Sequence, residues 1–273
     1  MNMKMRNKIA GAIYGFAIGD AMGATTEFMT SEQIRKTYGR VHDIIGGGWL
    51  HLRPGEITDD TQMTMCVMDA IMRMPENAEE FAKHCENNFI AWLNSGPKDV
   101  GGQCARGIRS MMLGKRIERD NTALGNGSLM RAMPLAVLGL PFFNMVQGAL
   151  THNNDVCSTA ILEYTEIIQD YLNDKGGNLY TFKVKSLLEP SGYILNTFNN
   201  AVYWSKRKTF SDAIIGAVNH GGDADTIAAI AGSLAGAKFG YDAIPQDWIS
   251  KLNPDVKEFL EKFKNFAFSC LQI

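Results

Sequence analysis

Apolar residues recur every three or four positions along most of the chain, which is the spacing of one buried face of an α-helix. This pattern predicts helices over residues 7–24, 61–74, 78–93, 104–113, 129–138, 144–151, 155–172, 192–205, 211–219, 226–238 and 254–269. Alternating strand-and-helix units are absent, and the connectors between the predicted helices are short. We therefore expect an all-α fold, with residues 1–273 forming a single compact domain.

Glycines mark one face of the first predicted helix. Gly11, Gly15, Gly19 and Gly23 occur at every fourth position. Each glycine costs roughly 1 kcal/mol relative to alanine inside a helix, so close packing or a nearby ligand should compensate. We expect another helix to pack closely against this face. The predicted helix 226–238 is rich in alanine and glycine, and we expect it at the centre of the fold.

Composition narrows the range of functions. The 273 residues are 45% hydrophobic and 21% charged, as in globular proteins with a large core. A net charge of -2 argues against general nucleic-acid binding, and we interpret the short basic run 206–208 as a solvated turn. Five cysteines without CxxC spacing favour reduced thiols. No apolar run reaches the ~20 residues of a membrane span, so we expect a cytoplasmic, monomeric protein outside the membrane.

Two acidic clusters stand far apart, each directly before a predicted helix. They are Thr58-Asp59-Asp60-Thr61 and Asp223-Ala224-Asp225-Thr226. Either cluster alone is explained by helix capping, because Asp and Thr oxygens accept the free N–H groups of a first turn. A cap needs only one side chain, however, and neighbouring carboxylates raise the free energy unless a cation neutralises them. Hard oxygen donors suit magnesium or manganese, so the pair predicts a divalent metal site.

Three other segments have both a functional and a plain structural interpretation. The loop 125–128 (GNGS) precedes the predicted helix 129–138, and N–H donors at a helix N-terminus suit a phosphate, although a turn with a serine cap explains the same residues. Asp99 is either a ligand-binding group or general base, or a residue that stabilises a turn. His152 either lines a pocket or belongs to a segment that capping by Asn154 explains.

Taken in order, four motifs resemble those of the ADP-ribosylglycohydrolase family. They are residues 19–28 (GDAMGATTEF), 55–63 (GEITDDTQM), 125–128 (GNGS) and 220–226 (HGGDADT). The likeness spans roughly residues 8–253, and the ordered set is specific although each motif alone is not. The resemblance implies a compact helical fold with a binuclear centre of Mg²⁺ or Mn²⁺ at the bottom of a cleft that holds ADP-ribose.

The resemblance also implies roles for single residues. The metal ligands would be Thr58, Asp59, Asp60, Asp223, Asp225 and Thr226. The substrate-binding residues would be Gly125, Asn126, Gly127 and Ser128, which would hold the diphosphate or the adjoining ribose, and His152. Glu27 matches the acidic residue near the metals, and Asp99 matches an acidic loop position that faces the substrate. Both are candidate catalytic carboxylates, and the sequence does not choose between them.

This assignment fits the chemistry of glycoside hydrolysis. Two cations can bind the ribose hydroxyls and a bridging water, which orients the sugar and lowers the pKa of the water. The anomeric carbon then passes through an oxocarbenium-like state. A nearby carboxylate can stabilise the positive charge of this state, or it can take a proton from the attacking water. The expected substrate is an ADP-ribosylated protein or a small ADP-ribosyl compound. Arginine is the leading acceptor, because the motifs are most similar to those of bacterial arginine-specific enzymes.

Three alternatives are weighed against this interpretation. Serine-linked ADP-ribose is a second possible substrate, and a non-catalytic protein that binds ADP-ribose or a partner would keep the same fold. A helical terpenoid synthase also uses acidic clusters, but residues 61–63 supply no further acid after Asp59 and Asp60, and its second motif would have Glu163 one residue late. That offset rotates the carboxylate by about 100° around a helix. The segment 176–191 matches no motif, and we expect a variable loop at the rim of the cleft.

Overall fold

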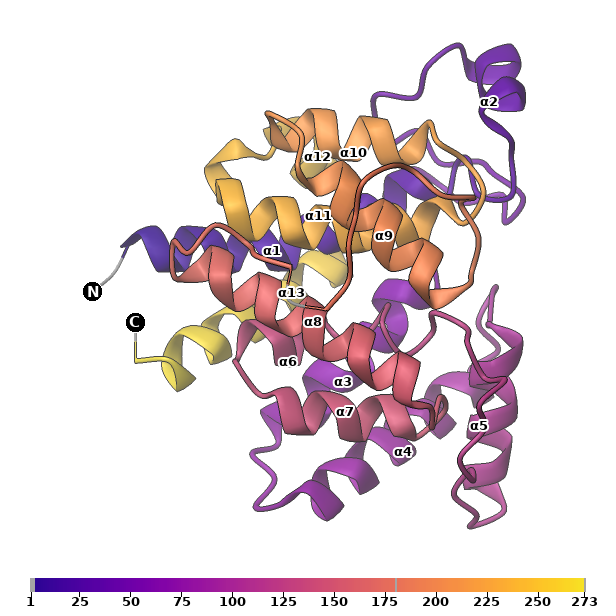
Figure 1. Cartoon of the computed structure of the whole chain (residues 1–273), viewed down its shortest axis with the longest axis vertical. Coiled ribbons are helices and arrows are strands. Elements are labelled where there is room, and N and C mark those ends of the chain that lie inside the picture. Colours follow the sequence, from indigo (N-terminus) through magenta and orange to yellow (C-terminus); the bar gives the residue numbers. More distant parts are fainter. Residues whose placement is uncertain (1–2, 180, 273) are drawn as a thin grey trace.

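Helices α1 (Met3–Gly23) and α11 (Ala224–Phe239) lie side by side through the middle of the molecule (Figure 1). They run antiparallel, and their backbones nearly touch. A Cβ added to Gly15 would lie 2.3 Å from the Gly232 carbonyl oxygen, and one added to Gly19 would lie 2.0 Å from that of Ala228. The glycine stripe of the first helix therefore packs closely against another helix, as predicted, and that helix is the small-residue helix α11.

The computed structural model describes residues 3–179 and 181–272. The remaining elements are α2 (Ser31–Tyr38), α3 (Asp59–Met72), α4 (Ala78–Asn94), α5 (Gly102–Met112), α6 (Met133–Val137), α7 (Pro141–Ala149), α8 (Asp155–Leu172), α9 (Ile194–Ser205), α10 (Phe210–Val218), a 3-10 turn (Tyr241–Ala243), α12 (Gln246–Lys251) and α13 (Pro254–Cys270). Within the described residues, extended pairing is limited to isolated bridges. The all-α prediction is confirmed.

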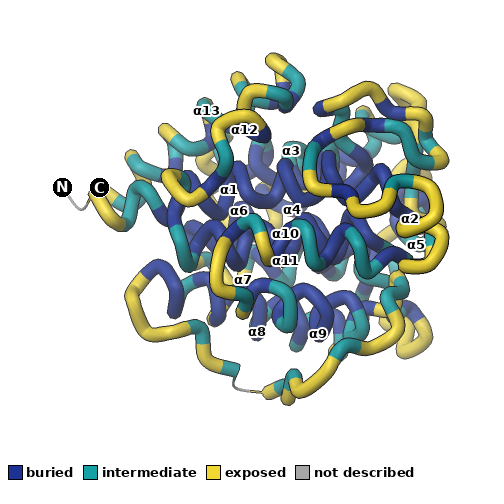
Figure 2. Tube along the Cα trace, turned by 90° about the horizontal axis from the view of Figure 1, so that it is seen from above, coloured by how far each residue is buried: buried dark blue, intermediate teal, exposed yellow. Residues whose placement is uncertain are grey.

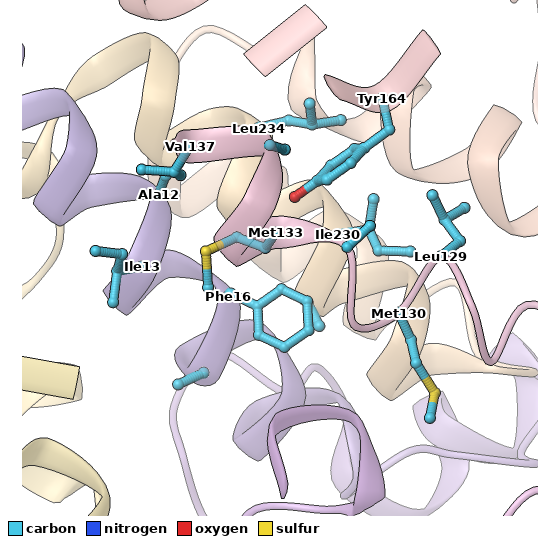
Figure 3. Close-up of a cluster of buried hydrophobic side chains, with 14 of the residues drawn as sticks. Ala12, Ile13, Phe16, Leu129, Met130, Met133, Val137, Tyr164, Ile230 and Leu234 are labelled. Atoms are coloured by element: carbon cyan, nitrogen blue, oxygen red, sulfur yellow. The ribbon is translucent and has the colours of Figure 1, made fainter. Parts of the chain in front are cut away.

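One hydrophobic core joins the helices around the central pair. Helices α9 and α10 pack on α11, while α3 packs on α4 and α6 on α8. Figure 3 shows Phe16 of α1, Met133 of α6, Tyr164 of α8 and Ile230 of α11 converging at the centre. In Figure 2 the buried residues concentrate in these helices, and the exposed ones lie in the surrounding loops and on the outer helices such as α2. None of the described helices is long and apolar enough to cross a membrane.

The pattern of apolar residues does not predict two short helices, α2 and α12. Helix α2 buries a single residue, Ile34, so it has no apolar period to detect. Its start is set instead by a capping box, in which Thr30 Oγ1 accepts from the Gln33 amide at 3.2 Å and the Thr30 amide donates to Gln33 Oε1 at 2.7 Å. Helix α12 spans only six residues, which is too short for helical periodicity to be recognised.

The predicted helix 129–138 is wrong over its first half. Helix α6 begins at Met133, and the preceding residues form turns. Pro134 has no N–H to donate to the Met130 carbonyl, which a helix begun at Leu129 would require. The Met130 carbonyl accepts instead from Thr64 Oγ1 at 3.1 Å. The loop 125–128 consequently does not lead directly into a helix.

Candidate metal centre and ligand cleft

Three helix ends meet beside one another and bring the two acidic clusters together. The last turn of α1 lies against the first turn of α11, where a Cβ added to Gly23 would lie 2.5 Å from the Ala224 carbonyl oxygen. Asp20, in the same part of α1, joins this end to α3. Its carboxylate accepts from the Thr58 amide at 3.1 Å, the Thr58 hydroxyl at 2.9 Å and the Thr61 amide at 3.0 Å. Asp20 is fully buried and fixes the N-terminus of α3.

The carboxylates of the two clusters face one another. Thr226 Oγ1 lies 3.2 Å from Asp60 Oδ2 and 3.3 Å from Asp223 Oδ1. Oxygens of Glu27, Asp223 and Asp225 all lie within 4.8 Å of one another. Two helix N-termini, those of α3 and α11, direct their positive dipole ends toward this group, which partly offsets the negative charge.

Burial and mutual repulsion make these groups hard to ionise. Burial, followed by the charge of nearby Asp99, raises the pKa of Asp59 to about 8. The pKa of Glu27 is likewise raised to about 8, mainly by burial and further by Asp99 and Asp223. Burial raises the pKa of Asp223 to about 6, against an opposing hydrogen bond from Asn126.

Asp60 and Asp225 are the most deeply placed carboxylates of the group. Burial and the surrounding carboxylates raise the pKa of both well above the ordinary value. Asp60 Oδ1 is buried and has no hydrogen-bond partner among the described residues. No lysine, arginine or histidine in the described parts of the chain forms an ion pair with either residue. A donor set of oxygens without a protein counter-charge fits a hard divalent cation.

The cluster lies in a cleft of about 340 Å³. Residues from both acidic clusters, three loops and an aromatic pair line it: Glu27, Phe28, Trp49, Asp59, Asp60, Asp99, Val100, Gly101, Gly102, Gln103, Cys104, Gly125, Asn126, Gly127, Met130, His152, Asp223, Asp225 and Thr226. The candidate site residues named from the sequence are all in this set except Thr58 and Ser128. Thr58 is the N-cap of α3, and the hydroxyl of Ser128 is buried without a partner among the described residues.

The loop 125–128 differs from the expected phosphate site at a helix N-terminus. Its amides are partly engaged, since the Asn126 amide donates to the Gly192 carbonyl at 3.0 Å and the Gly125 amide to Gln103 Oε1 at 3.4 Å. The Asn126 side chain donates to Asp223 Oδ2 and to Thr197 Oγ1. Because α6 starts only at Met133, no helix dipole acts on this loop. The loop therefore does not lie at a helix N-terminus, contrary to the prediction.

Asp99 and His152 both line the cleft. Asp99, in the loop between α4 and α5, accepts from the Val100 amide at 2.7 Å, and the neighbouring Gly101 amide donates to Asp59 Oδ2 at 3.2 Å. His152 is almost fully buried, and its Nδ1 lies 2.8 Å from Thr151 Oγ1. Burial and the charge of Arg131 lower its pKa well below the ordinary value, so the ring is neutral at pH 7.

Arg131 is a buried cation that sequence reasoning missed. It is fully buried, and its guanidinium donates to the Gly127 carbonyl at 2.8 Å, Thr151 Oγ1 at 2.7 Å and Gln147 Oε1 at 2.6 Å. Phe89 covers its face, with the guanidinium carbon 4.7 Å from the ring centroid. Arg131 thus positions both Gly127 and the threonine that holds His152. A single arginine among apolar residues gives no sequence signal for this role.

An exposed aromatic pair at the mouth of the cleft also escaped the sequence analysis. Phe28 and Trp49 are 66% and 46% exposed, and their ring centroids lie 5.4 Å apart. The indole N–H of Trp49 donates to Glu27 Oε2 at 2.6 Å. Phe28 has a φ of 60°, which is rare for a bulky residue and marks a constrained backbone beside Glu27. The only sequence feature that points to this pair is the position of Phe28 directly after Glu27 in the motif 19–28.

An all-α fold with carboxylates gathered at a ligand-sized cleft defines a class of helical proteins suited to bind a hard cation. Comparison with known sequences identifies the family. The profile of the ADP-ribosylglycohydrolase family matches residues 1–189 and 182–269, and the chain belongs to this family of hydrolases of ADP-ribosyl glycosidic bonds. The resemblance found in the sequence motifs is confirmed.

Individual relatives agree with this placement. The chain is 37% identical to ADP-ribosyl-[dinitrogen reductase] glycohydrolase of Rhodospirillum rubrum, over 94% of each chain. It is 30% identical to ADP-ribosylarginine hydrolase Tri1 of Pseudomonas putida (strain GB-1), over 90% of this chain and 74% of the relative. A solved structure described as an ADP-ribosylglycohydrolase-related protein complex superposes with a TM-score of 0.81 at 25% identity, covering 98% of both chains.

Proposed function

We propose that this protein removes ADP-ribose from modified arginine side chains in a reaction that depends on two divalent cations, Mg²⁺ or Mn²⁺. The observation that carries the proposal is the group of buried carboxylates in the cleft, which has no protein counter-charge among the described residues. Two relatives named as ADP-ribosylarginine hydrolases support arginine as the acceptor.

The proposed metal ligands come from the N-termini of α3 and α11. Asp59, Asp60, Asp223, Asp225 and Thr226 line the cleft and supply hard oxygen donors. Thr58 stays in the proposed set from its place in the motif, although its hydroxyl already donates to Asp20 at 2.9 Å. When bound, the cations would orient the ribose hydroxyls and lower the pKa of an attacking water.

Glu27 and Asp99 are the proposed catalytic carboxylates. Glu27 is close to Asp223 and Asp225 and receives the Trp49 hydrogen bond, which fixes its orientation. It is therefore our first choice to take a proton from water or to stabilise the oxocarbenium-like state. Asp99 lies on the neighbouring wall beside Asp59 and is the alternative.

The substrate is proposed to lie along the wall formed by the loop 125–128 and His152. Gly125 and Gly127 leave room beside the His152 ring, since a Cβ on Gly127 would lie 2.9 Å from its Cε1 atom. Neutral His152 can offer Nε2 to a polar ligand atom, because its Nδ1 is held by Thr151. We propose that Asn126 and Ser128 support this wall, with Asn126 orienting Asp223.

The proposal is tested by measuring release of free ADP-ribose from arginine-linked and serine-linked substrates, with Mg²⁺, with Mn²⁺ and with a chelator. We expect release from the arginine linkage that the chelator abolishes. Faster release from the serine linkage would show that serine, rather than arginine, is the preferred acceptor. Binding of ADP-ribose by folded, metal-loaded protein without release from either linkage would indicate a binding protein instead.

A further inference from the structure

A second cleft of about 720 Å³ has a lining that shares no residue with the catalytic cleft described above. It lies between α2, the loop that joins α9 to α10, and the C-terminal end of α10. Its lining includes Arg35, Arg40, Trp204, Arg207, Lys208 and His220. The volume falls within the range of small-molecule sites, about 300–1,000 Å³. None of the residues assigned above to metal, substrate or catalysis lines it.

Two paired backbone segments separate the second cleft from the catalytic cleft. The Phe28 amide donates to the Gly222 carbonyl at 2.7 Å, and the Gly222 amide donates to the Met29 carbonyl at 2.8 Å. Glu27 and Asp223 lie on the catalytic side of this pairing, while Ser31 and His220 line the second cleft. Asn219 fixes the wall of the second cleft, because its side chain bonds both the amide and the carbonyl of Val41, at 2.9 and 2.7 Å.

The two clefts have opposite charge. Carboxylates dominate the catalytic cleft, whereas the second cleft has four cationic residues, Arg35, Arg40, Arg207 and Lys208, against one acid, Asp212. Among the described residues none of these four cations forms an ion pair. Their charges are therefore available to an anion, and grouping them in one concave site raises the local potential for it.

Polar atoms without partners add a second, independent sign of a binding site. Trp204 Nε1, Arg207 Nε and His220 Nδ1 are buried and make no hydrogen bond within the described residues, and all three side chains line this cleft. Arg207 is held in place by stacking, with its guanidinium carbon 4.5 Å from the Tyr203 ring centroid and 4.6 Å from that of Trp204. A fixed guanidinium loses little entropy on binding an oxyanion.

The basic run 206–208 thus forms part of the wall of the second cleft. Contrary to the expected solvated turn, two of its residues line the cleft and one is stacked on two aromatic rings. We propose that the second cleft binds a small ligand with more than one anionic group, such as an organic bisphosphate. The Arg207 guanidinium stacks on the Trp204 ring and the backbone at Gly216 lies against the same ring, so the ligand is recognised by charge and hydrogen bonds rather than by stacking.

The test is isothermal titration of the metal-loaded full-length protein with fructose 1,6-bisphosphate as the probe. Inorganic phosphate forms a second arm and uncharged fructose a third. We expect one bisphosphate site per chain, weaker binding of phosphate and none of fructose. If phosphate binds as tightly as the bisphosphate, the site recognises a single anion and the proposal of a multiply charged ligand is wrong.

Substitutions in the second cleft test whether the bisphosphate binds there. Arg35 and Arg40 are exposed, so the double variant Arg35→Gln/Arg40→Gln should fold normally and weaken bisphosphate binding at least about tenfold. Lys36→Gln is the matched control, because Lys36 lies on the same helix outside the cleft and pairs with Glu32 at 2.8 Å. Its affinity should change less than about twofold. Absence of bisphosphate binding, or equal binding by the double variant and the control, would overturn the proposal.

Discussion

Glu27 differs from the aspartates around it in having a hydrogen-bond donor on an exposed aromatic side chain. Trp49 Nε1 lies 2.6 Å from Glu27 Oε2, and both residues line the proposed catalytic cleft. A hydrogen bond to a carboxylate is stronger than one between neutral groups, and it also fixes the direction of the carboxylate. The orientation of Glu27 therefore depends on a residue that does not itself carry charge.

Trp49→Phe keeps the aromatic contact with Phe28 and removes only the donor. We expect kcat/KM for ADP-ribose release to fall about tenfold, because the hydrogen bond that orients Glu27 is lost. Trp49 is 46% exposed, so the free energy of unfolding should change by less than about 0.5 kcal/mol. Steady-state kinetics and urea unfolding of the same preparations measure both quantities.

Trp92→Phe provides the control for that substitution. Trp92 Nε1 donates to Gln62 Oε1 at 2.8 Å, and neither residue lines the catalytic cleft. This variant removes the same kind of donor and should leave kcat/KM unchanged. An equal loss of activity in the two variants would show that Trp49 has no special relation to Glu27.

At the scale of the elements, the central helix pair determines where the acidic clusters meet. Helices α1 and α11 approach so closely that backbone atoms take the place of side chains at their contact. The contact extends along α1 to Gly23, next to the first turn of α11, where Asp225 and Thr226 lie. A change in the spacing of the two helices therefore also moves two of the proposed metal ligands.

Gly15→Ala tests this dependence. The added Cβ would lie 2.3 Å from the Gly232 carbonyl oxygen, so the helices must separate. We expect a loss of roughly 1–3 kcal/mol in the free energy of unfolding, as for other overpacked cores, measured by urea denaturation. Gly102→Ala is the control, because only the distant end of Arg106 lies within 4 Å of the new Cβ. Equal stability of the two variants would contradict close packing of α1 on α11.

The sequence predicts elements whose signals are local and misses residues that act through tertiary contacts. The glycine stripe and the acidic clusters are visible because spacing and charge reveal them. The sequence does not reveal the roles of Asp20, Arg131 and Trp49, because each acts through hydrogen bonds to residues far along the chain. Gly125, Asn126 and Gly127 line the cleft, but α6 begins at Met133 rather than at Leu129, because the helix predicted from periodicity includes the interior Pro134.

For the whole molecule, the carboxylate group links folding to pH and to cations. The pKa values of Glu27 and Asp59 are raised to about 8 and that of Asp223 to about 6. A carboxyl group with a raised folded pKa contributes stability that is fully present below its unfolded pKa, about 4, and is lost as the pH rises through the folded value. Without cations the protein should therefore become less stable between about pH 4 and 8.

Thermal unfolding between pH 5 and 8, in chelator and in saturating Mn²⁺, measures this linkage. We expect the midpoint in chelator to fall by several degrees as the pH rises, because buried carboxylates become ionised without a counter-charge. Cation binding requires the ionised carboxylates, so the stabilisation by Mn²⁺ should grow over the same range. If the stabilisation by Mn²⁺ is independent of pH, the carboxylates with raised pKa values are not the ligands of Mn²⁺.

The central claim is that the carboxylates of α3 and α11 hold the cations on which hydrolysis depends. Its most direct test is the number of Mn²⁺ ions bound per chain, by equilibrium dialysis, measured together with ADP-ribose release. We predict two ions for the wild type and for the control Asp255→Asn, which alters an exposed acid at the start of α13. Asp60→Asn and Asp225→Asn should each lose at least one ion and at least about a hundredfold in rate. Full turnover by either variant, or by the wild type in chelator, would contradict the claim.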